Sequence, residues 1–237
     1  MTILAFEFSS PQRSVAVLRP GPRSGGHEFT SSENGTRRTR PPENWDCEAI
    51  ETGGRQTNAF RMIEQALSEA AIEREQIDVI AVGLGPGSYT GIRAAISVAQ
   101  GWQLASEVEL LGVSSVEAIA AQAHTEKIRG RIHVVIDAQR GELYRAAFEI
   151  SPDGWREIEP LNILPLTEAQ LRAEQGEMLV GPEVTKWFPD GRIIFPRAAV
   201  VAELAARRSD FVPGEGLVPI YLRETNFVKS PPVRVMP

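Results

Sequence analysis

A glycine-rich segment is the part of the sequence whose residue types and spacing are best suited to chemistry. Residues 83–91 read GLGPGSYTG and connect an apolar run, 79–82, to a helical pattern. A loop between a strand and a helix presents free amides at a helix N-terminus, where the helix dipole favours anions. The segment is therefore a candidate phosphate-binding loop. In a competing structural interpretation, the glycines only form a tight turn and Ser88 or Thr90 caps the helix.

The spacing of this loop does not match the common nucleotide motifs. A P-loop needs Lys and then Ser or Thr after its second glycine, and a dinucleotide loop needs G-x-G-x-x-G. Here Gly85 and Gly87 are followed by Ser88, and no lysine follows. The residues identify no nucleotide, and both interpretations of the loop remain open.

Two acidic residues near expected turns are further candidates for phosphate or ion chemistry. Glu7 and Ser9 follow the first apolar run, and Asp137 begins a turn in the second half of the chain. An aspartate at that position is also a common turn-forming residue, so a structural role competes with the chemical one. The candidate phosphate site, which we expect to be vestigial, consists of Glu7, Ser9, Gly85, Gly87, Ser88 and Asp137.

Histidine and cysteine form no pattern typical of a metal site or a catalytic nucleophile. Two histidines four residues apart on a helix would place both rings on one face, where they can share a metal ion. His27, His124 and His133 stand alone, and Cys47 is the only cysteine. Ser88 lacks the G-x-S-x-G spacing of a hydrolase elbow, which disfavours a peptidase. We expect no metal, no disulfide and a reducing compartment, the cytoplasm.

Two helical patterns on either side of strand 79–82 are rich in apolar residues. The first, 56–71, carries an apolar stripe, and the second, 90–105, is apolar around nearly its whole circumference. Such a helix must be covered on all sides, either by its own chain or by another protein. We expect a partner interface on these helices, formed by Phe60, Ile63, Leu67, Ala94, Ala95, Val98 and Trp102.

The order of apolar runs and turns predicts an α/β protein with two similar halves, 1–106 and 107–237. Each half reads as a hairpin, a further strand, a helix, a strand and a helix, which fits two mixed sheets flanked by helices. The last segment is expected to pack back on the first half. The other expected strands are 3–6, 14–18, 27–31, 110–113, 132–136, 142–150, 158–164, 178–180 and 217–222, and the other helices are 115–123 and 198–208.

Charge and composition exclude several classes of protein. The net charge of -6 disfavours direct RNA binding, because that binding depends on clustered Lys and Arg. One basic cluster, 37–40, lies in a stretch from 19 to 44 that we expect to be a long solvated loop. The N-terminus shows no signal peptide, and the chain has no apolar run long enough to cross a membrane, so we expect no membrane association.

Motifs along the whole chain resemble those of the TsaB (YeaZ) family. The most specific is 85–93, GPGSYTGIR, which is followed by an alanine-rich helix and by 111–115, LGVSS. Segments 3–10, 136–144 and 219–223 also resemble the family. The resemblance implies two tandem ribonuclease-H-like domains of the actin/Hsp70/sugar-kinase type.

The same resemblance implies an accessory role in making threonylcarbamoyladenosine on tRNA. In this family the chain is a non-catalytic partner of a related catalytic subunit, TsaD, which it binds through N-terminal helices, and the ATPase TsaE joins the assembly. TsaD transfers a threonylcarbamoyl group from an adenylate to adenosine 37, so tRNA contacts are expected only through the complex. No cofactor is expected, and the apolar helices make a homodimer plausible.

A stand-alone ATPase or small-molecule kinase of the same fold is the alternative. The glycine segment, Glu7 and Asp137 motivate it. Nucleotide-binding members of the wider fold carry an aspartate near the position of Glu7, and the extra methylene of glutamate would displace a bound ion. This departure favours the non-catalytic interpretation.

Overall fold

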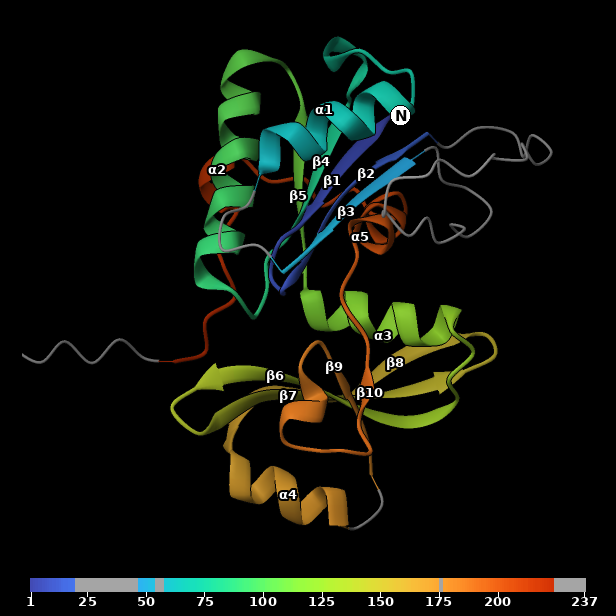
Figure 1. Ribbon diagram of the computed structural model, residues 1–237. Helices are drawn as coiled ribbons and strands as arrows, with labels where there is room; N and C mark the ends of the chain where they lie inside the picture. Colours follow the sequence, from blue (N-terminus) through green and yellow to red (C-terminus); the bar gives the residue numbers. More distant parts are fainter. Residues whose placement is uncertain (20–46, 54–57, 175–176, 224–237) are drawn as a thin grey trace, which may run out of the picture.

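Two five-stranded mixed sheets form the framework of the chain, with helices outside and between them (Figure 1). The computed structural model describes residues 1–19, 47–53, 58–174 and 177–223. The strand expected at 27–31, the basic cluster and nearly all of the expected long loop lie outside these residues. None of the described helices is long and apolar enough to cross a membrane.

The first sheet has the strand order β3-β2-β1-β4-β5. Its strands are β1 (Ile3–Glu7), β2 (Gln12–Leu18), β3 (Cys47–Thr52), β4 (Val79–Gly83) and β5 (Glu109–Val113). The first three pair antiparallel, and β1, β4 and β5 pair in parallel. β1 and β4 are buried along their whole length, as expected of central strands covered on both faces.

The second sheet repeats this topology, with the order β10-β9-β6-β7-β8. Its strands are β6 (Gly130–Gln139), β7 (Glu142–Ser151), β8 (Gly154–Pro165), β9 (Met178–Gly181) and β10 (Arg192–Ile193). In both sheets the first strand pairs antiparallel with the second and parallel with the fourth. The expected architectural repeat is therefore present.

Helices cover the faces of both sheets in layers (Figure 1). α1 (Ala59–Glu69) and α2 (Tyr89–Ala105) pack on one face of the first sheet. α3 (Ser115–Thr125) and α5 (Ala198–Ala205) lie between the two sheets, and α4 (Leu166–Glu174) packs on the outer face of the second. Short 3-10 turns lie at η1 (Arg74–Gln76), η2 (Val184–Lys186) and η3 (Gly214–Gly216).

Helix α5 follows the second sheet along the chain but packs on the first. Its alanines and valines share a core with residues of β1, β2 and β4. The Ala198 amide donates to Ser14 Oγ (2.7 Å), and the Ala199 amide donates to Glu48 Oε1 (3.1 Å). Glu48 also pairs with Arg197. The two halves are therefore joined by a shared core as well as by the chain.

Three sequence-based expectations about the elements are corrected. β5 pairs with β4, so a division at residue 106 would separate a strand from its own sheet, and the halves divide after β5. Residues 217–222 form no strand, because Pro219 has no N–H to donate to a ladder. The elements β3 and α4 were not expected, since their short and highly charged sequences hide the apolar pattern.

Candidate functional site

The glycine segment packs directly on the end of β1. The Ser88 amide donates to the Ser9 carbonyl (2.7 Å), and the Gly85 amide donates to Ser115 Oγ (3.1 Å). Gly87 has a φ of +148°, and a Cβ there would lie 2.1 Å from the Ser9 carbonyl oxygen. Glycine is required at this position because any side chain would clash with the backbone of the neighbouring turn.

Glu7 is sealed beneath this segment. Its side chain has no solvent exposure, Oε1 accepts a hydrogen bond from the Ser9 amide (2.7 Å), and Oε2 accepts one from Ser115 Oγ (2.8 Å). A Cβ on Gly83 would lie 2.0 Å from Oε2. Burial raises the pKa of Glu7, and the hydrogen bonds from Ser9 and Ser115 oppose that rise. The carboxylate therefore organises the loop from inside.

Asp137 lies apart from this cluster, in the hairpin between β6 and β7. Its Oδ1 accepts from the Gln139 amide (2.7 Å), and its Oδ2 pairs with Lys186 Nζ (3.2 Å). Gln139, Arg140 and Gly141 all have positive φ. An aspartate bonded to the amide two residues later is the arrangement of a tight turn. The geometry thus supports the structural interpretation of Asp137.

The last described residues, 217–223, connect the glycine segment with this hairpin. The Ile220 amide donates to the Leu84 carbonyl (2.9 Å), and Arg223 donates to the Ala138 carbonyl (3.0 Å). Figure 1 shows the segment passing from the side of the first sheet toward the second. Residues 217–223 therefore link the glycine segment to the β6–β7 hairpin, the two loops that hold the candidate phosphate-binding residues.

The structure brings most of the candidate phosphate site together but engages its polar groups internally. The Glu7 carboxylate accepts from the Ser9 amide and from Ser115. The Ser88 amide donates to the Ser9 carbonyl, and the Gly85 amide donates to Ser115. These bonds favour the interpretation of the glycine segment as a turn. A loop built to hold phosphate would direct its amides outward.

Two of the three histidines are held by local bonds. His124 Nε2 lies 3.2 Å from a backbone carbonyl. His133 is buried, with Nδ1 2.6 Å from Arg145 and Nε2 3.1 Å from Glu177. Among the described residues, no three His, Cys, Asp or Glu side chains are grouped so that they could hold a metal ion. His27 lies outside the described residues.

The expected helical interface is corrected at three positions. Ile63, Leu67 and Ala95 are buried in the chain's own core, because α1 and α2 use these positions to cover the first sheet. Phe60 behaves differently: it is 71% exposed.

The outward side of α2 carries apolar side chains that sequence reasoning did not single out. Leu104 is 91% exposed. Tyr89 is exposed and stacks on Tyr221 with ring centroids 5.3 Å apart. Leu104 lies away from the positions of α2 that pack inward, so a helical-wheel analysis against a known buried face would have found it. Tyr89 is exposed because it is the first residue of the helix. We define the helical face as Phe60, Tyr89, Ala94, Val98, Trp102 and Leu104.

Comparison with known proteins assigns the chain to a family. The model of the TsaD family, tRNA N6-adenosine threonylcarbamoyltransferase, matches residues 55–202. The chain belongs to this family. One relative, the tRNA threonylcarbamoyladenosine biosynthesis protein TsaB of Escherichia coli K12, is 28% identical over 240 residues, which cover 94% of this chain and 95% of TsaB.

Other members of the family extend this similarity to the fold. TsaB of Bacillus subtilis is 25% identical over 149 residues, covering 63% of this chain and 56% of that protein. The solved structure of YeaZ from Pseudomonas aeruginosa superposes with a TM-score of 0.71 at 25% identity, covering 93% of this chain and 99% of YeaZ. The fold of this chain is the actin-like, ribonuclease-H-like fold of the TsaB (YeaZ) proteins.

Proposed function

We propose that this chain is a non-catalytic subunit that supports a TsaD-type subunit in threonylcarbamoyl transfer to adenosine 37 of tRNA. The similarity to the tRNA threonylcarbamoyladenosine biosynthesis protein TsaB of E. coli supports the pathway. The state of Glu7 supports the non-catalytic role most directly, since its carboxylate is fully buried and bonded to Ser9 and Ser115. A carboxylate in this state holds the fold and does not reach a substrate.

The helical face supplies the surface for a partner. Leu104 and Phe60 expose large apolar side chains, and each square ångström of such surface removed from water contributes roughly 25 cal/mol. A TsaD-type subunit covers this face in the assembly, and a TsaE-type ATPase joins it. In the absence of TsaD, a second copy of this chain covers the same face. The negative net charge fits a subunit that meets tRNA only through the complex, in the cytoplasm.

Reconstitution tests the division of labour. The purified chain, the TsaD-type subunit and the two together are each given tRNA and threonylcarbamoyl adenylate, and modified adenosine is measured by mass spectrometry. We expect no transfer by this chain alone, and faster transfer by the pair than by the TsaD-type subunit. Asp137→Asn should leave the rate of the pair within about twofold, because Asp137 serves a surface turn.

Two kinds of outcome would contradict the proposed supporting role. Transfer by this chain alone, or ATP hydrolysis by it that Asp137→Asn abolishes, would replace the proposal with the stand-alone ATPase or kinase. Equal rates with and without this chain would also contradict a supporting role.

A further inference from the structure

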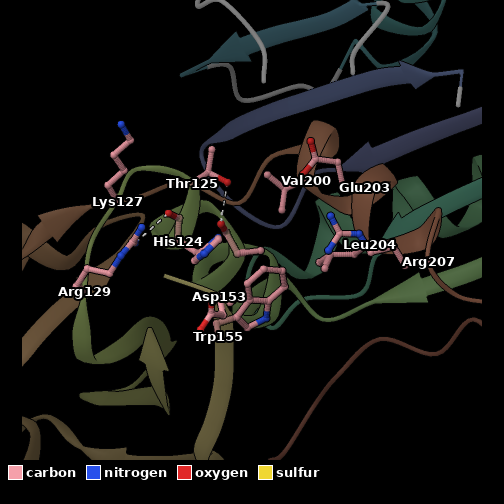
Figure 2. A pocket seen from close by; sticks show the side chains of 12 residues that line it. His124, Thr125, Lys127, Arg129, Asp153, Trp155, Val200, Glu203, Leu204 and Arg207 are labelled. Atoms are coloured by element: carbon pink, nitrogen blue, oxygen red, sulfur yellow. Dashed lines mark hydrogen bonds between the residues drawn. The ribbon is translucent and has the colours of Figure 1, made fainter. Parts of the chain in front are cut away.

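A cleft of about 490 Å³ lies between α3, α5 and the turn that joins β7 to β8. None of its lining residues belongs to the helical face. Its apolar lining comes from Ala121, Val200 and Leu204, together with Trp155. Figure 2 shows Trp155, Val200 and Leu204 around the cleft. The volume falls within the range of roughly 300–1,000 Å³ that is typical of small-molecule sites.

Trp155 is a fixed aromatic surface in this cleft. Its indole packs against two hydrophobic cores, that of the first sheet and that of the second. Its ring centroid lies 5.6 Å from that of His124, at an interplanar angle of 51°. An indole that is held on two sides and still lines a cleft offers a stacking partner for a planar ring at little entropic cost.

Cationic side chains lie at both ends of the cleft. Figure 2 shows Lys127 and Arg129 on one side and Arg207 on the other, with Trp155 between them. Arg129 donates to the His124 carbonyl (3.2 Å). The side chains of Lys127 and Arg207 have no hydrogen bond or ion pair within the described part of the chain. Both are therefore available to an anionic group.

Two carboxylates share this rim, from Asp153 and Glu203. They would repel a simple anion, so the cleft is poorly suited to a small dianion such as phosphate alone. A ligand that carries hydroxyl donors as well as a phosphate satisfies both kinds of charge, because carboxylates accept hydrogen bonds from hydroxyl groups. Acidic side chains bind ribose hydroxyls in this way in dinucleotide sites.

We propose that this cleft binds a nucleotide. The base stacks on Trp155, the ribose hydroxyls donate to Asp153 or Glu203, and the phosphate contacts Lys127 or Arg207. A free nucleotide and a nucleotide unit of a single-stranded RNA share this chemistry. The site is separate from the helical face, so the proposal is independent of the subunit role argued above.

Calorimetry on the full chain tests the proposal with four probes: ADP, adenosine, inorganic phosphate and a short single-stranded oligoadenylate. We expect one saturable site for ADP, and binding at least about tenfold weaker for adenosine and for phosphate, since each lacks a group that the cleft recognises. Charge reversal of the cation that contacts the phosphate, by Lys127→Glu or Arg207→Glu, should weaken ADP binding by about tenfold, and the double variant should do so whichever of the two it is. Both side chains are exposed, so the variants are expected to fold.

A matched control distinguishes binding in this cleft from binding at the β6–β7 hairpin, where Asp137 lies. Lys186→Glu changes an exposed cation that pairs with Asp137, and it should leave ADP binding unchanged. An oligoadenylate that binds more tightly than ADP, and is weakened by the same double variant, would identify the source as an RNA chain; equal affinity would identify the free nucleotide.

Three results would overturn the proposal. They are no saturable binding of either ADP or oligoadenylate, binding that survives the double variant of Lys127→Glu and Arg207→Glu, and binding that is lost in Asp137→Asn. The indole NMR signal of Trp155 provides a second readout, which should shift on addition of ADP.

Discussion

At the scale of single residues, Gly87 and Gly91 are explained by how closely the backbone that follows β1 approaches them. A Cβ on Gly91 would lie 2.0 Å from the carbonyl oxygen of Phe8, and one on Gly87 would lie 2.1 Å from that of Ser9. Both oxygens belong to the backbone of the turn that follows β1, and a backbone oxygen cannot move aside as a flexible side chain can. A motif that suggests phosphate binding therefore serves close packing in this chain.

Two glycines of α2 provide a matched test of this packing. Gly91→Ala should lower the free energy of unfolding by about 2 kcal/mol or more, because the methyl group collides with the Phe8 carbonyl oxygen. Gly101 lies in the same helix with nothing within 4 Å of its Cβ position, so Gly101→Ala should raise the free energy by roughly 0.5–1 kcal/mol. Urea denaturation measures both. A similar change in the two variants would show that close packing does not explain Gly91.

The buried Glu7 predicts a pH dependence of stability. Burial raises its folded pKa above the ordinary value of 4.5, so the stability that it contributes is full at lower pH and is lost as pH rises through the folded pKa. Glu7→Gln removes this titration. We expect the stability of the variant relative to the wild type to increase from pH 4.5 to pH 8, measured by urea denaturation. Parallel pH profiles for the two proteins would contradict this assignment.

Residue patterns indicated where these groups lie, but not what they touch. The sequence predicted a strand before the glycine segment and a helix after it, because apolar periodicity is local. Ser115, which bonds both Glu7 and Gly85, follows them by many residues and carries no local signal. Only such long-range contacts could decide whether the glycine segment is a phosphate-binding loop or a tightly packed turn.

At the scale of elements, α2 shows a limit of periodicity analysis. Its pattern is apolar around most of the helix, so the existence of the helix was predictable and its inward face was not. Small residues such as Ala94 and Ala95 look alike in sequence, yet the first is partly exposed and the second is buried. The expected interface consequently included residues that the first sheet covers.

The N-terminus of α5 depends on one buried carboxylate. One carboxylate oxygen of Glu48 accepts a hydrogen bond from the Ala199 amide. The negative charge of Glu48 pairs with Arg197. Glu48→Gln should lower the free energy of unfolding by about 1–3 kcal/mol. As a control, Glu64→Gln removes an exposed pair with Arg74 and should change it by less than about 0.5 kcal/mol. Equal effects in denaturation experiments would exclude α5 anchoring by Glu48.

At the scale of the whole molecule, the two halves repeat one topology, and the second half contributes α5 to the core of the first sheet. The order of elements along the chain predicts this repeat, although no sequence string is duplicated. The position of α5 depends on contacts between β2, β3 and the chain near residue 198. The expectation that the last segment packs back on the first half did not specify these contacts.

We infer that this chain works by presenting its helical face to a TsaD-type partner, and a pair of leucine variants provides the test. Leu104→Arg and Leu171→Arg each replace an exposed leucine, one on α2 and the other on α4. Co-purification with a TsaD-type subunit should weaken by at least about tenfold for Leu104→Arg and stay unchanged for Leu171→Arg, while both variants keep the unfolding curve of the wild type. Undiminished binding by Leu104→Arg, or equal loss in both variants, would contradict the claim.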